Sequence, residues 1–197
     1  MKEAFYEESA VCIKSKREGM IYKIFHIASI VMFVLAGIWL SFSFTFILDN
    51  LSAGASGMAL VIVLIEWFLF PLCSIAAGIA LLFLKRHFNV SYDYTFVEDE
   101  LRVTKVYNGK RRKYLTTLKA EQMLKIGWCD KDSFERTKQG AGKPKLLTSN
   151  KEPMEEKEFI YILYSSSIAK TLYVLECRQL LLEYIVRAAG RNKLERD

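Results

Sequence analysis

Two long apolar runs dominate the first half of the chain. They cover residues 24–48 and 59–84, and the only charged residues from 24 to 84 are Asp49 and Glu66. A helix needs about 20 apolar residues to cross the ~30 Å hydrocarbon core of a bilayer, and each run exceeds that length. The connector is short and rich in Gly and Ser, so the pattern predicts an antiparallel hairpin of two membrane-spanning helices.

After residue 87 the pattern changes to short alternating runs that predict β-strands. Asn108-Gly109 is a strong hairpin signal, because both residues tolerate positive φ. The segment 130–158 is polar and contains two Gly and two Pro, so we expect a long loop there. The predicted strands are 90–97, 101–107, 110–118, 123–128, 159–164 and 170–175, with a short strand near 145–147.

Residues 176–189 carry apolar side chains at helical spacing. The apolar face of such a helix must be buried against a sheet. The expected fold is therefore a membrane α-helical hairpin followed by an α+β domain, in which an antiparallel β-barrel or curved sheet is covered by one C-terminal helix.

The strand Tyr92-Asp93-Tyr94-Thr95-Phe96 and the basic cluster Lys110-Arg111-Arg112-Lys113 follow the two apolar runs. In this layout the chain resembles an uncharacterised family of small bacterial two-span membrane proteins with a PH-like cytoplasmic domain. The resemblance implies a PH-like β-barrel or sheet and brings no activity with it. We expect an N-terminal cytoplasmic segment at 1–23, a transmembrane hairpin at 24–86 and the PH-like domain at 87–197.

Basic residues flank the hairpin on its outer sides only. Because positive residues favour the cytoplasmic side, both chain termini are predicted to be cytoplasmic at the cell (plasma) membrane, with the connector outside. The flanking basic residues are Lys14, Lys16, Arg17 and Lys23 before the first run, and Lys85 and Arg86 after the second.

The region from Lys85 onward has 23 basic and 16 acidic residues. Its densest positive cluster consists of Lys105 and the run from Lys110 to Lys113. We predict that this cluster binds anionic lipid or a protein partner. The opposing interpretation is a solvated basic strand edge that prevents sheet-to-sheet aggregation. Alternation along a strand would send these side chains to two faces, and both interpretations stay open. No nucleic-acid partner is expected. The cluster comprises Lys105, Lys110, Arg111, Arg112 and Lys113.

Within the hairpin, Gly37, Ser41 and Thr45 predict a small polar face on the first helix, and Ser74 and Gly78 a small-residue pair on the second. Glu66 lies at the depth of Ser41. Its carboxyl group should face Ser41, another protomer of a homo-oligomer or a partner, or be protonated. We favour a satisfied polar residue over a proton- or cation-sensitive site, since no second ionisable group lies nearby.

No catalytic motif is present. The four cysteines form no CxxC motif, and the histidines have no ligands at metal spacing, so no metal or cofactor is expected. Gly142-Lys143 is not part of a phosphate loop, because Thr137 stands where that motif needs Gly. The predicted function is a non-enzymatic, membrane-anchored interaction module that binds a protein partner or inner-leaflet lipid. The alternative is an accessory subunit of a transport or envelope complex that uses Glu66.

Overall fold

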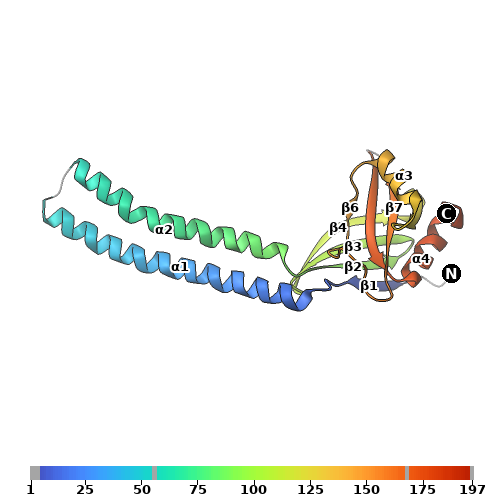
Figure 1. Cartoon of the computed structure of the whole chain (residues 1–197), viewed down its shortest axis with the longest axis horizontal. Helices are drawn as coiled ribbons and strands as arrows, with labels where there is room; N and C mark the ends of the chain where they lie inside the picture. Colours follow the sequence, from blue (N-terminus) through green and yellow to red (C-terminus); the bar gives the residue numbers. More distant parts are fainter. Residues whose placement is uncertain (1–4, 55–56, 167–168, 196–197) are drawn as a thin grey trace. The chain divides into compact units, whose positions relative to one another are not determined.

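The computed structural model describes residues 5–54, 57–166 and 169–195, and the side chains of residues 59, 60, 63, 64 and 66 lie outside that description. The chain forms two compact units (Figure 1). The hairpin unit is Lys16–Phe88, and the β unit combines Met1–Ser15 with Asn89–Asp197. Each is described by itself below.

The hairpin unit contains two long helices, α1 (Ser15–Ser52) and α2 (Met58–Leu84), followed by the short 3-10 helix η1 (Lys85–His87). Helix α1 begins before the predicted first span and ends beyond it. Both α1 and the part of α2 that begins at Trp67 are long and apolar enough to cross a membrane. In Figure 1 the two helices run antiparallel to each other.

Small residues pack between the two helices. On α2, the predicted pair Ser74 and Gly78 is buried, and a Cβ atom added at Gly78 would lie 3.0 Å from the Phe33 ring. This pair is therefore confirmed as part of a close helix–helix contact. At the other end of the hairpin, Trp39 stacks on Trp67 with ring centroids 5.5 Å apart.

The small polar face predicted on α1 does not pack against α2. Ser41 is exposed, and its hydroxyl donates to the Gly37 carbonyl of its own helix at 3.0 Å. The buried small residues of α1 are instead Ser29, Ala36 and Ser43. They are seven residues apart, and seven residues return a straight helix to within about 20° of the same direction. Residues spaced by four, such as Gly37, Ser41 and Thr45, turn progressively around the helix axis. They therefore do not follow a long seam with one neighbouring helix.

The β unit consists of two four-stranded sheets and two helices. The first sheet has the order β1-β2-β3-β4, and the second has the order β5-β7-β8-β6. All pairs are antiparallel except β6 with β8. The elements are β1 (Tyr6–Ala10), β2 (Val90–Val97), β3 (Glu100–Tyr107), β4 (Arg111–Lys119), β5 (Met123–Trp128), α3 (Asp132–Ala141), β6 (Lys145–Leu146), β7 (Glu158–Ser165), β8 (Lys170–Cys177) and α4 (Gln179–Ala189), with 3-10 turns η2 (Ala120–Gln122) and η3 (Arg191–Lys193).

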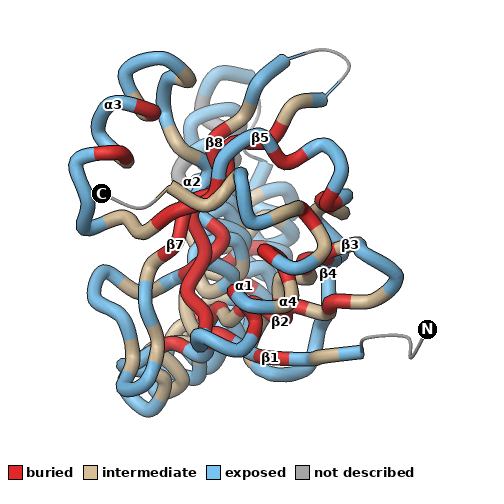
Figure 2. The backbone as a smooth tube through the Cα atoms, turned by 90° about the vertical axis from the view of Figure 1, so that its right-hand side faces the viewer, coloured by how far each residue is buried: buried red, intermediate tan, exposed pale blue. Residues whose placement is uncertain are grey.

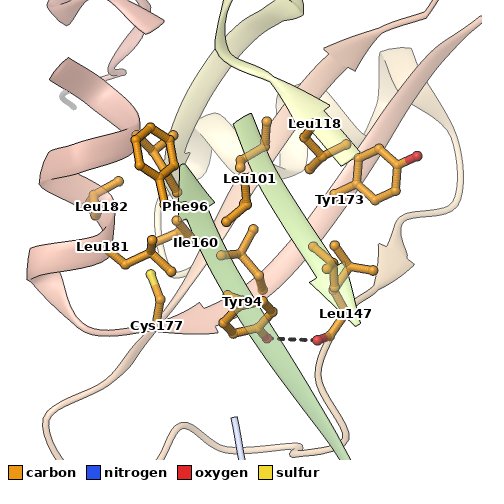
Figure 3. Close-up of a cluster of buried hydrophobic side chains, with 14 of the residues drawn as sticks. Tyr94, Phe96, Leu101, Leu118, Leu147, Ile160, Tyr173, Cys177, Leu181 and Leu182 are labelled. Atoms are coloured by element: carbon orange, nitrogen blue, oxygen red, sulfur yellow. Dashed lines mark hydrogen bonds between the residues drawn. The ribbon is translucent and has the colours of Figure 1, made fainter. Parts of the chain in front are cut away.

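The core of the β unit lies between the two sheets and α4. Figure 2 shows β7 buried along most of its length. Leu181 and Leu182 of α4 face Phe96 and Ile160, as the close-up shows (Figure 3). The predicted antiparallel fold with one C-terminal helix over the sheets is confirmed.

The N-terminal segment contributes a strand to the first sheet. β1 pairs antiparallel with β2, with Tyr6 opposite Phe96 and Ala10 opposite Tyr92. The hairpin unit is thus inserted between two neighbouring strands of one sheet. Sequence periodicity does not reveal β1, because the inward position Glu8 is charged and breaks the alternation.

Helix α3 replaces part of the long loop predicted for 130–158, so that prediction is wrong for residues 132–141. Composition hides this helix, since only one large apolar residue, Phe134, packs inward, with its ring 5.6 Å from that of Tyr161. Asp132 begins the helix with a negative charge, and Gly142 ends it at φ 79°.

Candidate functional site: the basic β3–β4 hairpin

A tight turn joins β3 to β4. Asn108 and Gly109 have φ values of 51° and 67°, as a two-residue hairpin turn requires, and the Lys110 amide donates to the Tyr107 carbonyl at 3.1 Å. The turn is also bonded to Asn89, the residue at which the chain enters β2 from the hairpin unit. The Asn108 amide donates to the Asn89 carbonyl at 2.8 Å, and the Asn89 side chain donates to Asn108 Oδ1 at 2.6 Å.

The strand register divides the predicted cluster between two faces. Lys105 lies opposite Lys113, and Tyr107 lies opposite Arg111, so these four side chains share one face of the sheet. Arg112 points to the other face. Two like charges directly opposite each other repel, and an anion between them would relieve that repulsion.

Two of the five predicted cations are engaged within the β unit. The Lys105 ammonium lies 5.0 Å from the Tyr107 ring centroid and 5.8 Å from that of Tyr92, within cation–π range. Arg112 Nε lies 3.4 Å from the Asp93 carboxylate. Within the described residues, the other three cations form no ion pair. These are Lys110, Arg111 and Lys113.

The start of β4 is exposed on both faces. Residues 111–115 are all exposed, including Tyr114 at 60% and Leu115 at 38%. β4 is also an edge strand of its sheet. Arg binds phosphate oxygens in a bidentate manner, and Tyr suits the interface between water and lipid. The surface is therefore complementary to a partner that carries phosphate groups and an apolar region.

The predicted intramembrane residues are not part of this surface. Ser41 is exposed on α1, where it bonds to its own helix. Glu66 lies within α2, and its side chain is outside the described residues.

Burial keeps one tyrosine and two cysteines of the β unit neutral, because it raises the pKa of each of them. Burial raises the pKa of Tyr94, and the hydroxyl of this residue donates to the Leu147 carbonyl at 2.8 Å. Burial, with the nearby Asp130 charge, raises the pKa of Cys129 to about 12, and burial also raises that of Cys177. Such thiols are weak nucleophiles. Among the described residues, no group of His, Cys, Asp and Glu could hold a metal ion.

The sequence interpretation missed a second polar surface, a cleft lined by α3, β5 and the C-terminal segment. It contains Lys125, Arg136 and Glu195, which are distant from one another in sequence. Gly142 and Pro144 form a helix stop signal that could have indicated the end of α3, but no local pattern indicates where Glu195 binds.

A family model described as a bacterial PH-like domain (DUF6106) matches residues 3–194. The matched region begins before β1 and ends after η3, so it includes both the inserted hairpin and the β unit. The comparisons with curated proteins and with solved structures give no match.

Proposed function

Because the chain belongs to the bacterial PH-like domain family, whose function is uncharacterised, we propose that it is a membrane-anchored, non-enzymatic interaction module. In this proposal α1 and α2 span the membrane, and the β unit, which is the PH-like domain, contacts anionic head groups of the same membrane through the β3–β4 hairpin. The observation that carries the proposal is the pair of hydrogen bonds between Asn108 and Asn89.

The insertion of the hairpin unit supports a two-span topology. β1 and β2 are hydrogen-bonded neighbours, and the hairpin unit connects them. The two ends of the hairpin must therefore emerge on one side of the membrane, which two spans achieve and one span does not. The basic residues at both ends favour the cytoplasmic side.

The chain itself keeps the basic turn close to the proposed membrane surface. Asn89 follows the last residue of α2, Leu84, by a short segment that extends no further than ~18 Å at ~3.6 Å per residue. Asn108 is bonded directly to Asn89. The unpaired cations beside Asn108 are therefore held within reach of the head groups for as long as α2 stays in the bilayer.

The expected attraction is modest. A cation near an anionic leaflet contributes ~1 kcal/mol, so Lys110, Arg111 and Lys113 together contribute ~3 kcal/mol. This interaction is intramolecular with respect to the anchor, so a weak contact is sufficient to populate the bound state. It also decreases with salt, because the cations are exposed.

Hydrogen–deuterium exchange of the full chain in nanodiscs tests the proposal. Amides of residues 107–115 should exchange more slowly in discs with anionic lipid than in neutral discs, and this protection should decrease at high salt. Replacing two of the three cations, Arg111→Gln and Lys113→Gln, should remove most of the difference. The control, Lys143→Gln with Lys151→Gln, removes the same charge from exposed positions elsewhere and should preserve it. Equal protection in neutral and anionic discs would contradict the lipid contact.

A further inference from the structure

A cleft of about 550 Å³ lies beside α3 and the edge of the second sheet. Its lining includes three cationic side chains and two hydroxyl groups. The residues that matter here are Lys125, Ser133, Arg136, Lys170 and Glu195. This cleft shares no residue with the β3–β4 hairpin, so a ligand bound in it would be independent of the lipid contact.

The C-terminal segment adds an extended piece of chain to the edge of β5. β5 is an edge strand of its sheet. Leu194 pairs with Ile126 in the parallel sense, and the Glu195 amide donates to the Ile126 carbonyl at 2.8 Å. The open edge therefore recognises extended main chain.

The Glu195 carboxylate occupies a site built for an anion. The Lys125 ammonium donates to one carboxylate oxygen, and the Tyr161 hydroxyl donates to the other at 2.6 Å. Burial alone would raise the pKa of Glu195, but these two hydrogen bonds and the nearby Arg136 charge lower it. The site thus stabilises a carboxylate specifically in its ionised form.

Glu195 does not use all the donors of the cleft. Ser133 is 4% exposed, and its hydroxyl forms no well-aligned hydrogen bond within the described residues. The Tyr161 hydroxyl donates its proton to Glu195; burial raises the pKa of Tyr161, whereas its interaction with the nearby Ser133 and Thr137 hydroxyls acts to lower it. A buried hydroxyl group without a well-aligned hydrogen bond is costly, so the position of Ser133 in the wall of the cleft points to a ligand that supplies a better acceptor. Lys170 adds a further positive charge to the lining.

We propose that this cleft binds an extended acidic segment of a partner protein, and that Leu194 and Glu195 occupy it in cis. The segment would pair with the β5 edge, place one carboxylate between Lys125 and Tyr161, and supply a second acceptor to Ser133. A peptide fits better than a free phosphate, because the resident segment is held by its main chain as well as by its carboxylate.

Occupation in cis lowers the affinity for the partner segment. An incoming ligand binds only the fraction of molecules whose C-terminal segment has left the cleft, and its apparent affinity falls by that fraction. Loss of the charge-assisted bonds in Glu195→Gln should therefore increase the affinity at least about tenfold. Leu194→Gly, which weakens the docking of the segment without changing a donor of the cleft, should act in the same direction.

The test uses the full chain in neutral nanodiscs and fluorescence anisotropy of a labelled probe peptide, Gly-Leu-Glu-Asp-Glu-Gly. The peptide should bind Glu195→Gln more tightly than the unmodified chain. In the Glu195→Gln background, Lys125→Gln and Ser133→Ala should each weaken binding. The control pair Arg111→Gln and Lys113→Gln should leave peptide affinity unchanged, so that a failure of the lipid contact is distinguishable from a failure of this site.

Three results would overturn the proposal. The first is equal peptide affinity for the unmodified chain, Glu195→Gln and Leu194→Gly. The second is equal binding of a probe with Gln in place of its acidic residues. The third is displacement of the bound probe by millimolar inorganic phosphate, which would assign the cleft to a small anion.

Discussion

A buried ion pair fastens β1 to the rest of the β unit. Lys157 Nζ lies 3.0 Å from the Glu8 carboxylate, and the two side chains are only 7% and 5% exposed. The same carboxylate accepts the Arg178 amide at the start of α4, at 3.1 Å, and Lys157 also donates to the Ser9 carbonyl at 2.6 Å. The pair therefore connects the N-terminal strand with the segments before β7 and α4.

Removal of one partner leaves the other charge buried. Such a loss typically costs about 3–5 kcal/mol, and we expect Lys157→Met to lower the free energy of unfolding by that amount. The double variant Glu8→Gln with Lys157→Met removes both charges and keeps an acceptor for the Arg178 amide. It still loses the bond to Ser9, at about 1 kcal/mol, so a total cost of about 1–2 kcal/mol is expected.

Pulse proteolysis of the full chain across a urea series measures these changes in the β unit. Lys151→Met, at an exposed lysine, is the control and should change the free energy by less than about 0.5 kcal/mol. The reasoning is refuted if the double variant loses as much free energy of unfolding as Glu8→Gln and Lys157→Met lose together, because the two charges would then not be coupled.

Four further changes probe other parts of the molecule. Gly78→Leu should separate α1 from α2, since its Cβ meets the Phe33 ring at 3.0 Å, and should reduce cross-linking between cysteines placed on the two helices. Gly109→Val should cost about 1–2 kcal/mol in chemical denaturation, because its φ of 67° strains a β-branched residue. The pKa of Glu195 is lowered in the folded state, so the docked C-terminal segment should be fully stabilised above the pKa that Glu195 has in the unfolded chain. Docking should be lost as the pH falls through the lowered pKa, and hydrogen exchange of the Glu195 amide measures this loss. A fragment of residues 89–197 should show a poorly dispersed NMR spectrum, whereas the same fragment joined to residues 1–15 by a flexible linker should fold.

Hydrophobic periodicity was sufficient to predict much of the fold. Strands β2, β3, β7 and β8 and helix α4 bury regular stripes of apolar residues, which is the signal that periodicity carries, whereas the hairpin follows from the length of its two apolar runs. β1 and α3 were missed because their inward positions include Glu8, Ser133 and Thr137, which are satisfied by tertiary partners or line a cleft.

Local sequence patterns predicted part of the basic cluster but none of the contacts between distant segments in the candidate sites. Strand alternation predicted that the basic cluster would divide between two faces, and the register places Arg112 apart from Lys105, Arg111 and Lys113 in that way. The pairing of Arg112 with Asp93 depends on two strands separated by β3 and has no local signal. Spacing along the chain likewise carries no information on the Lys125–Glu195 contact, which only the folded sheet creates.

The insertion of the hairpin unit between β1 and β2 has a consequence for biosynthesis. The ribosome releases β1 first, and its partner strand follows only after both apolar helices have emerged. In the proposed two-span topology, failure of one helix to insert would leave β1 and β2 in different compartments, and the first sheet would lack its edge strand. The exposed flank of β2 would then be accessible to proteases, so in that topology completion of the first sheet would depend on the insertion of both helices.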